Sequence, residues 1–157
     1  RRPVDWPARR NALDDLIPLL DHPSPEEVRA LFERPDPRAY LYLTARLLRW
    51  RRAHPELAAA AGYTDLAPKG EGADNWLAFA RFTGNADASD AALLSVVARH
   101  PLTRDPAAPA TLPLPPPLAG RAWTDVLTGT AVETSDALSL RTLPTDNIAV
   151  LHAEGSG

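Results

Sequence analysis

The sequence predicts an α+β protein, in which N-terminal helices precede an antiparallel β-sandwich. In residues 1–61, apolar side chains recur three and four positions apart, as they do along one face of a helix. From Tyr63 onward the period changes to two, and turn residues separate about seven short apolar runs, which is typical of a β-sandwich. We therefore expect a helical segment at residues 1–61 and an all-β domain at residues 62–157.

Capping residues mark two helices at the start of the chain. Asp5 is the expected N-cap of the first, and Ser24 with Glu27 forms the capping box of the second, because these side chains accept hydrogen bonds from free backbone N–H groups. Pro18 has to lie at a kink or end the first helix early, since proline lacks an N–H group. The apolar stripe of the first helix comprises Leu13, Leu16, Ile17 and Leu20.

Residues 40–63 connect the helical segment to the β domain, and most of them are expected to form a third helix. Pro55 disfavours helix at the residue before it, so a short separate piece follows at residues 56–61. Gly62 then provides a left-handed C-cap. The apolar face of the third helix comprises Tyr40, Leu43, Leu47 and Trp50.

The β half is predicted from alternation and turn residues. The run at residues 92–98 is continuously apolar, which favours a strand covered on both faces. The proline-rich stretch at residues 101–117 is mostly irregular, with an edge strand at most at residues 111–114. The other expected strands cover residues 63–67, 76–82, 123–127, 131–134 and 148–152, and Thr128-Gly129 closes a hairpin.

Composition argues against several kinds of partner. The formal net charge is −3 and the isoelectric point is about 5.8, whereas non-specific binding to nucleic acid or to an anionic membrane needs a basic surface. We therefore interpret the row Arg46, Arg49 and Arg52 as a solvated helix face. No cysteine is present, so neither a disulfide framework nor a zinc–thiolate site is available.

The start of the chain indicates a piece of a longer polypeptide. Methionine is absent, including at position 1, and the chain begins with a proline-bounded turn. Neither a signal peptide nor an apolar run of about 18 residues is present. We expect a cytoplasmic protein that does not enter a membrane.

The titratable residues form no catalytic or metal-binding pattern. Adjacent carboxylates on a helix point in different directions, and the remaining ones lie in loops or before a strand. No pair of histidines has the i, i+4 spacing of a metal site. We therefore expect no catalytic residue, no metal and no cofactor. The residues considered are Asp14, Asp15, Glu26, Glu27, Asp87, Asp90, Asp136, His22, His54, His100 and His152.

Five stretches, taken in order, suggest a family. They are RRPVDWPARR at residues 1–10, LLRWRRAHPEL at 47–57, GYTDLAPKGEGADNWLAFAR at 62–81, DVLTG at 125–129 and LRTLPTDNIAVLHA at 140–153. Together they resemble the C-terminal part of maltooligosyltrehalose synthase, a family of the α-amylase clan. In that family the opening stretch is normally the second half of an aspartate-rich motif, and this chain begins in the middle of it.

The resemblance implies a part of an isomerase of trehalose biosynthesis. The family converts the reducing-end α-1,4 link of a maltooligosaccharide into an α,α-1,1 link by intramolecular transglycosylation. It also implies that the helices are the remnant of the last part of a TIM barrel and that the β-sandwich is the C-terminal domain. The catalytic carboxylates of the family lie on barrel strands upstream of this chain. The chain alone is therefore expected to be inactive, and its partners are the rest of the barrel or a second copy.

The resemblance also implies candidates for contact with the maltooligosaccharide substrate. The opening motif of the family lies on the loop after the last barrel strand, on the catalytic side of the barrel. There Arg1, Arg2 and Asp5 could bind sugar hydroxyls or hold neighbouring loops, and Trp6 could stack on a sugar or fill a gap. Lys69 lies at a turn. For each residue we favour the structural role over the functional one.

Two other functions fit parts of the sequence. A stand-alone β-sandwich carbohydrate-binding module needs tryptophans exposed in a row, whereas the alternation around Trp76 favours burial, and we interpret Trp50 and Trp123 as core residues too. A nucleic-acid or protein-interaction module would use the arginine row and bind in a salt-dependent way. The net charge makes it the least favoured function.

Overall fold

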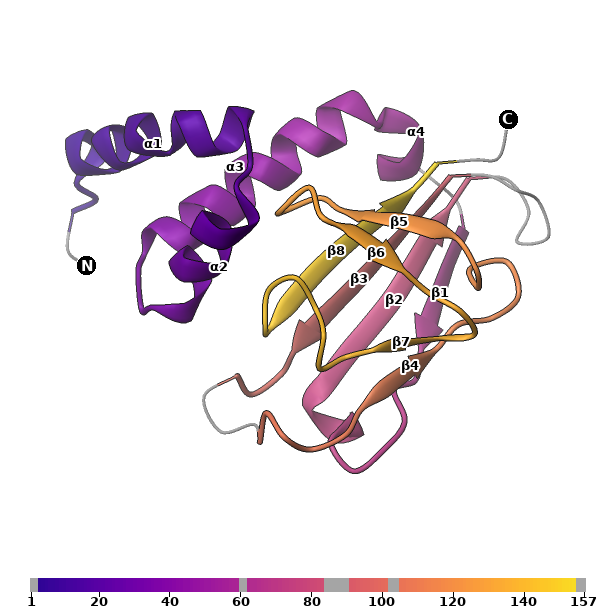
Figure 1. The fold of residues 1–157 in the computed structure, drawn as a ribbon. Helices are drawn as coiled ribbons and strands as arrows, with labels where there is room; N and C mark the ends of the chain where they lie inside the picture. Colours follow the sequence, from indigo (N-terminus) through magenta and orange to yellow (C-terminus); the bar gives the residue numbers. More distant parts are fainter. Residues whose placement is uncertain (1–2, 60–61, 84–90, 102–104, 155–157) are drawn as a thin grey trace.

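The computed structural model describes residues 3–59, 62–83, 91–101 and 105–154. Within these residues four α-helices come first and eight strands follow (Figure 1), which confirms the α+β class. The helices are α1 (Trp6–Asp21), α2 (Pro25–Glu33), α3 (Arg38–Ala53) and α4 (Pro55–Ala58). The strands are β1 (Gly62–Leu66), β2 (Trp76–Phe82), β3 (Ala92–Ala98), β4 (Thr111–Pro113), β5 (Ala122–Asp125), β6 (Ala131–Glu133), β7 (Ala137–Ser139) and β8 (Ile148–Ala153).

The first two helices begin at the predicted caps. The carboxylate of Asp5 accepts a hydrogen bond from the backbone N–H of Ala8 at 3.0 Å, and the hydroxyl of Ser24 accepts one from Glu27 at 3.4 Å. Each bond satisfies an N–H group that the helix itself leaves unpaired. α1 continues past Pro18 for three more residues to its end, so the proline does not end the helix early. In the described part of the chain, no helix has both the length and the apolar character needed to cross a membrane.

The apolar face predicted for α3 is only partly correct. Tyr40 is 77% exposed, whereas Ala39 and Tyr42 are buried. Apolar and aromatic side chains lie on several sides of α3, so periodicity alone could not show which side faces the core. The hydroxyl of Tyr42 reaches a backbone carbonyl after β5, and this long-range contact selects the buried side.

Gly62 is not the predicted left-handed cap, because it begins β1. Among the described glycines, a positive φ occurs at Gly70, Gly120 and Gly129. A side chain at position 62 would collide with the ring of Phe82, which is the partner of Gly62 in the register of β1 and β2. The glycine therefore leaves room for the ring of Phe82 to lie against β1.

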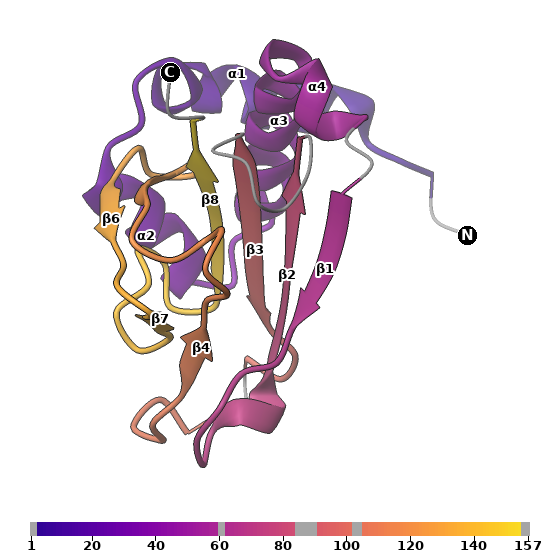
Figure 2. The same cartoon turned by 90° about the vertical axis from the view of Figure 1, so that its right-hand side faces the viewer.

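The strands form two antiparallel sheets of unequal size. The large sheet has the order β1-β2-β3-β8-β5-β6, and β4 pairs with β7 in the small one. The last strand of the chain thus lies in the middle of the large sheet, with Leu94 of β3 opposite Leu151. Figures 1 and 2 both show the small sheet on one face of the large sheet. The predicted edge strand near residues 111–114 is confirmed as β4, and the second layer has only two strands.

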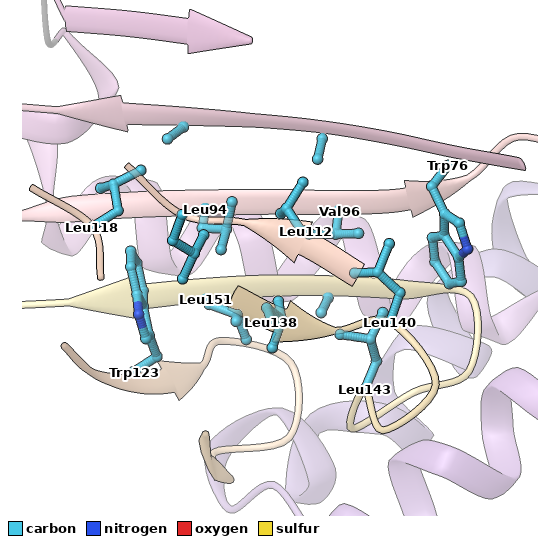
Figure 3. Close-up of a cluster of buried hydrophobic side chains, with 14 of the residues drawn as sticks. Trp76, Leu94, Val96, Leu112, Leu118, Trp123, Leu138, Leu140, Leu143 and Leu151 are labelled. Atoms are coloured by element: carbon cyan, nitrogen blue, oxygen red, sulfur yellow. The ribbon is translucent and has the colours of Figure 1, made fainter. Parts of the chain in front are cut away.

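The main core lies between the two sheets (Figure 3). Leu94 and Leu151 come from the large sheet, and Leu112 comes from β4 of the small one. Trp76 and Trp123 are both buried and lie at opposite ends of this cluster. We call this cluster the sheet core.

β3 is buried on one face only, which corrects the prediction of a strand covered on both. Leu94 and Val96 are fully buried in the sheet core, whereas Val97 is 39% exposed on the outer face. Tyr63 of β1 and Leu77 of β2 are also exposed. A continuous apolar run fits either setting, and in this fold the helices contact β8 and leave the outer face of β1–β3 uncovered in the described residues.

A second apolar cluster joins the helices to the sheet. Leu20 of α1, Val28 of α2 and Tyr42 of α3 are buried together with Leu127, which follows β5. Ile148, the first residue of β8, packs against the same cluster. We call it the helix core. Because it contains side chains from both halves of the chain, the helices and the large sheet share packing.

Candidate functional site

The residues predicted to lie near substrate are not brought together. Arg1 and Arg2 lie outside the described residues. Asp5 caps α1, and Trp6, beside it, is 69% exposed, so it fills no gap in the described chain. Lys69 is exposed, and its backbone pairs with Thr111 in an isolated bridge. Figures 1 and 2 show the start of α1 and the β1–β2 connection at distant places.

The carboxylates considered in the sequence lie on the surface where they are described. Asp14, Asp15, Glu26, Glu27 and Asp136 are exposed, and Asp87 and Asp90 lie outside the described residues. Within the described ranges, no group of three or more histidine, aspartate or glutamate side chains is placed to hold a metal ion. The residues that sequence reasoning missed lie elsewhere, where α3 meets the large sheet.

Asp125 is the central missed residue, and it organises the turn between β5 and β6. Its carboxylate accepts hydrogen bonds from the backbone N–H of Val150 at 3.1 Å and from the N–H and hydroxyl of Thr128 at 3.0 and 2.8 Å. Gly129 completes the turn with φ +73°, a value that suits glycine. The sequence contains a local signal for this turn, because an aspartate followed closely by threonine and glycine is typical of turns.

Burial and hydrogen bonding act on Asp125 in opposite directions. Burial raises the pKa of this carboxyl above its ordinary value, while the bonds from Thr128 and from the backbone N–H groups of Val150 and Leu127 lower it. The burial effect is the larger, because a buried carboxylate loses its hydration. With its oxygens occupied by donors, Asp125 is a structural residue and is not positioned to attack a substrate.

α3 holds the same turn from the other side. The hydroxyl of Tyr42 donates to the carbonyl of Leu127 at 2.6 Å. The guanidinium of Arg46 donates to the carbonyl of Val126 at 2.8 Å and to that of Leu20 at 3.1 Å. Burial raises the pKa of Tyr42 to about 12, so its hydroxyl stays a donor. We call this set of contacts the joint.

The joint corrects the interpretation of the arginine row. Arg46 is half-buried and binds three elements together, whereas Arg52 is exposed. Arg49 forms an exposed ion pair with Asp21 at 2.6 Å. The predicted solvated face therefore holds for the C-terminal part of the row and fails at Arg46. Spacing along a helix could not show that backbone carbonyls of a distant turn would lie opposite this residue.

A cluster of three rings forms a second attachment between α3 and the sheet. The rings of Trp50 and His54 are stacked, with centroids 4.4 Å apart. His152 of β8 contacts both, at 5.2 Å from Trp50 and 4.7 Å from His54. Histidines that look scattered in the sequence thus meet in the fold. His152 also lines an open, polar hollow with Arg121, Thr124 and Glu154 among its walls.

Large apolar side chains along α1 and α3 are exposed in the described residues. The first halves of both helices line one groove and their second halves line another, so the two helices run in the same direction. The large side chains exposed on these two helices are Trp6, Leu13, Ile17, Tyr40 and Leu48. We call this set the open helix face. Leu16 and Leu20, from the same stripe of α1 as Leu13 and Ile17, are buried, so the predicted apolar stripe of α1 is only half covered.

Comparisons with protein-family models, with curated proteins and with solved structures found no match to this chain. The functional argument therefore rests on the residues and their geometry. The described residues provide the joint, the ring cluster and the open helix face. In the joint and the ring cluster, side chains hold α3 against the β half, and the open helix face is apolar and exposed.

Proposed function

We propose that this chain is the non-catalytic C-terminal part of a cytoplasmic enzyme of the maltooligosyltrehalose synthase kind. In such an enzyme the reducing-end α-1,4 link of a maltooligosaccharide becomes an α,α-1,1 link. The helices would be the end of a TIM barrel, and the two β layers would be the C-terminal β-sandwich. The resemblance of five ordered stretches supports this proposal, and the open helix face is the structural observation on which it depends.

The open helix face suits a position on the outside of a barrel. Successive outer helices of a TIM barrel run in the same direction and pack their apolar sides on the strands. α1 and α3 run in the same direction, and Leu48 of α3 is 58% exposed on the uncovered side. Burying one such leucine completely is worth about 1.5–3 kcal/mol. A partner surface would therefore gain several such contributions from Leu13, Ile17 and Leu48.

The proposal assigns the chemistry to residues outside this chain. Retaining glycosidases need two carboxylates about 5–5.5 Å apart, one as nucleophile and one as acid and base. Asp125, a fully buried carboxylate, is engaged by the N–H groups and the hydroxyl of the β5–β6 turn. What the chain would supply is a cover for the barrel and a brace for the loop at residues 1–6.

The alternative of a carbohydrate-binding module needs exposed tryptophans to bind sugar, and the tryptophans of the β half are buried. Trp76 and Trp123 are buried in the sheet core, and Trp50 belongs to the ring cluster. Trp6 is exposed but lies on α1, away from the strands. No row of exposed tryptophans exists on the described strands, so we retain the first proposal.

Activity measurements test the proposal directly. The chain is incubated with maltopentaose, and the concentration of reducing ends is followed. We expect no loss of reducing ends, because the catalytic carboxylates belong to the barrel. Conversion of maltopentaose to a non-reducing product by the chain alone would overturn the proposal.

Complementation tests the role of the open helix face. The barrel part of a maltooligosyltrehalose synthase, cut before the segment that matches residues 1–10, is mixed with the chain, and formation of non-reducing product is measured. We expect the chain to increase activity and Leu48→Asp to remove the increase. Leu77→Asp is the matched control, since Leu77 is 54% exposed on the outer sheet face. Equal loss of activity with both variants, or no increase with the unmodified chain, would contradict the proposal.

A further inference from the structure

The ring cluster connects the end of α3 to the C-terminal strand at a point separate from the joint. Trp50 lies in the last turn of α3, His54 lies between α3 and α4, and His152 lies in β8. The contacts of His152 with both other rings tie β8 to the α3–α4 junction. The joint, by contrast, holds α3 one to two turns earlier, through Tyr42 and Arg46.

The two imidazoles are placed so that their charges would interact. Nδ1 of His54 lies 3.0 Å from the carbonyl oxygen of Trp50, which directs the rest of this ring toward β8. The centroids of His54 and His152 are 4.7 Å apart. Two imidazolium ions at this separation repel each other, and the repulsion is strengthened where the rings are shielded from water.

The surroundings of His152 favour its neutral form. Burial lowers the pKa of His152, and the positive charge that His54 carries when protonated lowers it further. Glu154 of the C-terminal region and Glu56 of α4 act in the opposite direction. Arg121 lines the same hollow and adds a cation. The strand neighbours of His152 in the register, Leu93 and Thr124, carry no charge.

The bonds that Tyr42 and Arg46 of α3 make in the joint have no comparable dependence on acid. The guanidinium of Arg46 keeps its charge at every pH at which proteins are studied. The hydroxyl of Tyr42 is protonated in neutral and acidic solution alike, because its pKa is about 12. The backbone carbonyls of Val126 and Leu127 that accept these bonds do not titrate. The two attachments of α3 to the sheet therefore differ in kind.

We propose that the ring cluster is an acid-labile clasp: protonation of both imidazoles releases the α3–α4 junction from β8, while the joint keeps the rest of α3 attached. The clasp is closed when at least one imidazole is neutral. Opening exposes Trp50 and widens the polar hollow beside His152, without separating the helices from the sheet. This inference does not depend on the proposed enzyme, because it follows from contacts within the chain.

Nuclear magnetic resonance of the full chain, recorded from pH 7.5 to pH 5, tests the clasp. Backbone amide signals and their heteronuclear relaxation are followed for residues 50–58 and 148–153. We expect these residues to lose order as the solution becomes acidic, at a pH below the ordinary pKa of histidine because the pKa of His152 is lowered, while the amides of Val126 and Leu127 stay ordered. Simultaneous loss of order at Val126 and Leu127 would mean general unfolding and would overturn the proposal.

Histidine substitutions separate the clasp from other acid effects. In His152→Gln and in His54→Gln only one imidazole remains, so the local transition is expected to disappear. His100→Gln is the matched control, because His100 is exposed and lies outside the cluster, and it should show the transition of the unmodified chain. Persistence of the transition in His152→Gln, or order at residues 50–58 after both imidazoles have titrated, would overturn the clasp.

Discussion

The sheet core and the helix core differ in how completely they are enclosed. The sheet core is covered by β strands on both sides, and Trp123, Leu94 and Leu112 are almost inaccessible to solvent. The helix core includes Leu127 and Ile148 from the β half, but the neighbouring side chains of the open helix face remain exposed. The β layers thus complete their own packing, whereas the helices depend on the joint and leave apolar surface exposed.

This difference explains why the joint is built from hydrogen bonds. An open cluster of helices gains less from burial than a closed sandwich, because part of its apolar surface stays in water. Tyr42 and Arg46 add directional bonds to carbonyls of the β5–β6 turn, and Asp125 holds the N–H groups of the same turn. The turn is therefore held from both sides by bonds within the chain.

The largest expected effect comes from removing a side chain that closes the sheet core. Trp123→Ala should lower the free energy of unfolding by about 3–5 kcal/mol, because a large buried ring is replaced by a cavity. Urea denaturation followed by circular dichroism measures this change. Trp123→Phe should cost clearly less, since the indole N–H is buried without a hydrogen-bond partner and a ring still fills the site. Equal costs for both variants would contradict the closed packing of the core.

The second effect concerns Asp125, which supports the joint from the sheet side. Asp125→Ala should lower the free energy of unfolding by about 2–4 kcal/mol, because buried donors on Thr128 and Val150 lose their acceptor. The same urea titration measures it. Asp136→Ala is a suitable control, since Asp136 is exposed. A cost below about 0.5 kcal/mol, the range of ordinary surface substitutions, would show that the turn does not depend on this carboxylate.

The pH dependence of stability gives a third test, with a definite sign. The pKa of Asp125 is raised by burial, so the folded state binds a proton more readily than the unfolded state does. The stabilisation from this group is therefore complete below the pKa of the unfolded carboxyl and is lost as the pH rises through the folded value. Between pH 3 and pH 7, the unfolding free energy of the unmodified chain minus that of Asp125→Asn should fall. A difference that rises with pH would show that the pKa of Asp125 is not raised in the folded state.

A smaller effect is expected at the helix side of the joint. Tyr42→Phe removes the donor to Leu127 and should lower the free energy of unfolding by about 0.5–1.5 kcal/mol. Tyr40→Phe serves as the matched control, because Tyr40 is largely exposed, and it should change stability very little. Thermal denaturation of both variants decides the comparison. Equal effects would mean that the contact with the β5–β6 turn does not hold α3.

The smallest effect is expected at the open helix face. Ile17→Asp should change the stability of the chain by no more than about 0.5 kcal/mol, since Ile17 lies on the uncovered side. Leu20→Asp, one turn along on the buried side of α1, should destabilise strongly because it buries a charge. Circular dichroism melting curves measure both. A large loss of stability with Ile17→Asp would show that this face is covered within the chain itself.

Much of the secondary structure follows from local patterns, and the candidate site does not. Asp5 and Ser24 mark helix starts because each cap involves residues three positions apart, and the alternation around Trp76 marks a strand with one buried face. The meeting of His54 with His152, and of Arg46 with the β5–β6 turn, joins residues far apart in the chain. No periodicity or composition carries information about such pairs.

By itself, the sequence determined the order of helices and strands, the caps that begin the first two helices, and the absence of any disulfide. Tertiary structure alone decided that α3 buries Tyr42 and exposes Tyr40, and that β3 is covered on one face. It also decided that the ring of Phe82 lies against Gly62, where a side chain would collide with it. The physical reason is the range of the forces involved. Capping and alternation act between near neighbours, whereas the choice among several apolar surfaces depends on which distant surface each one meets.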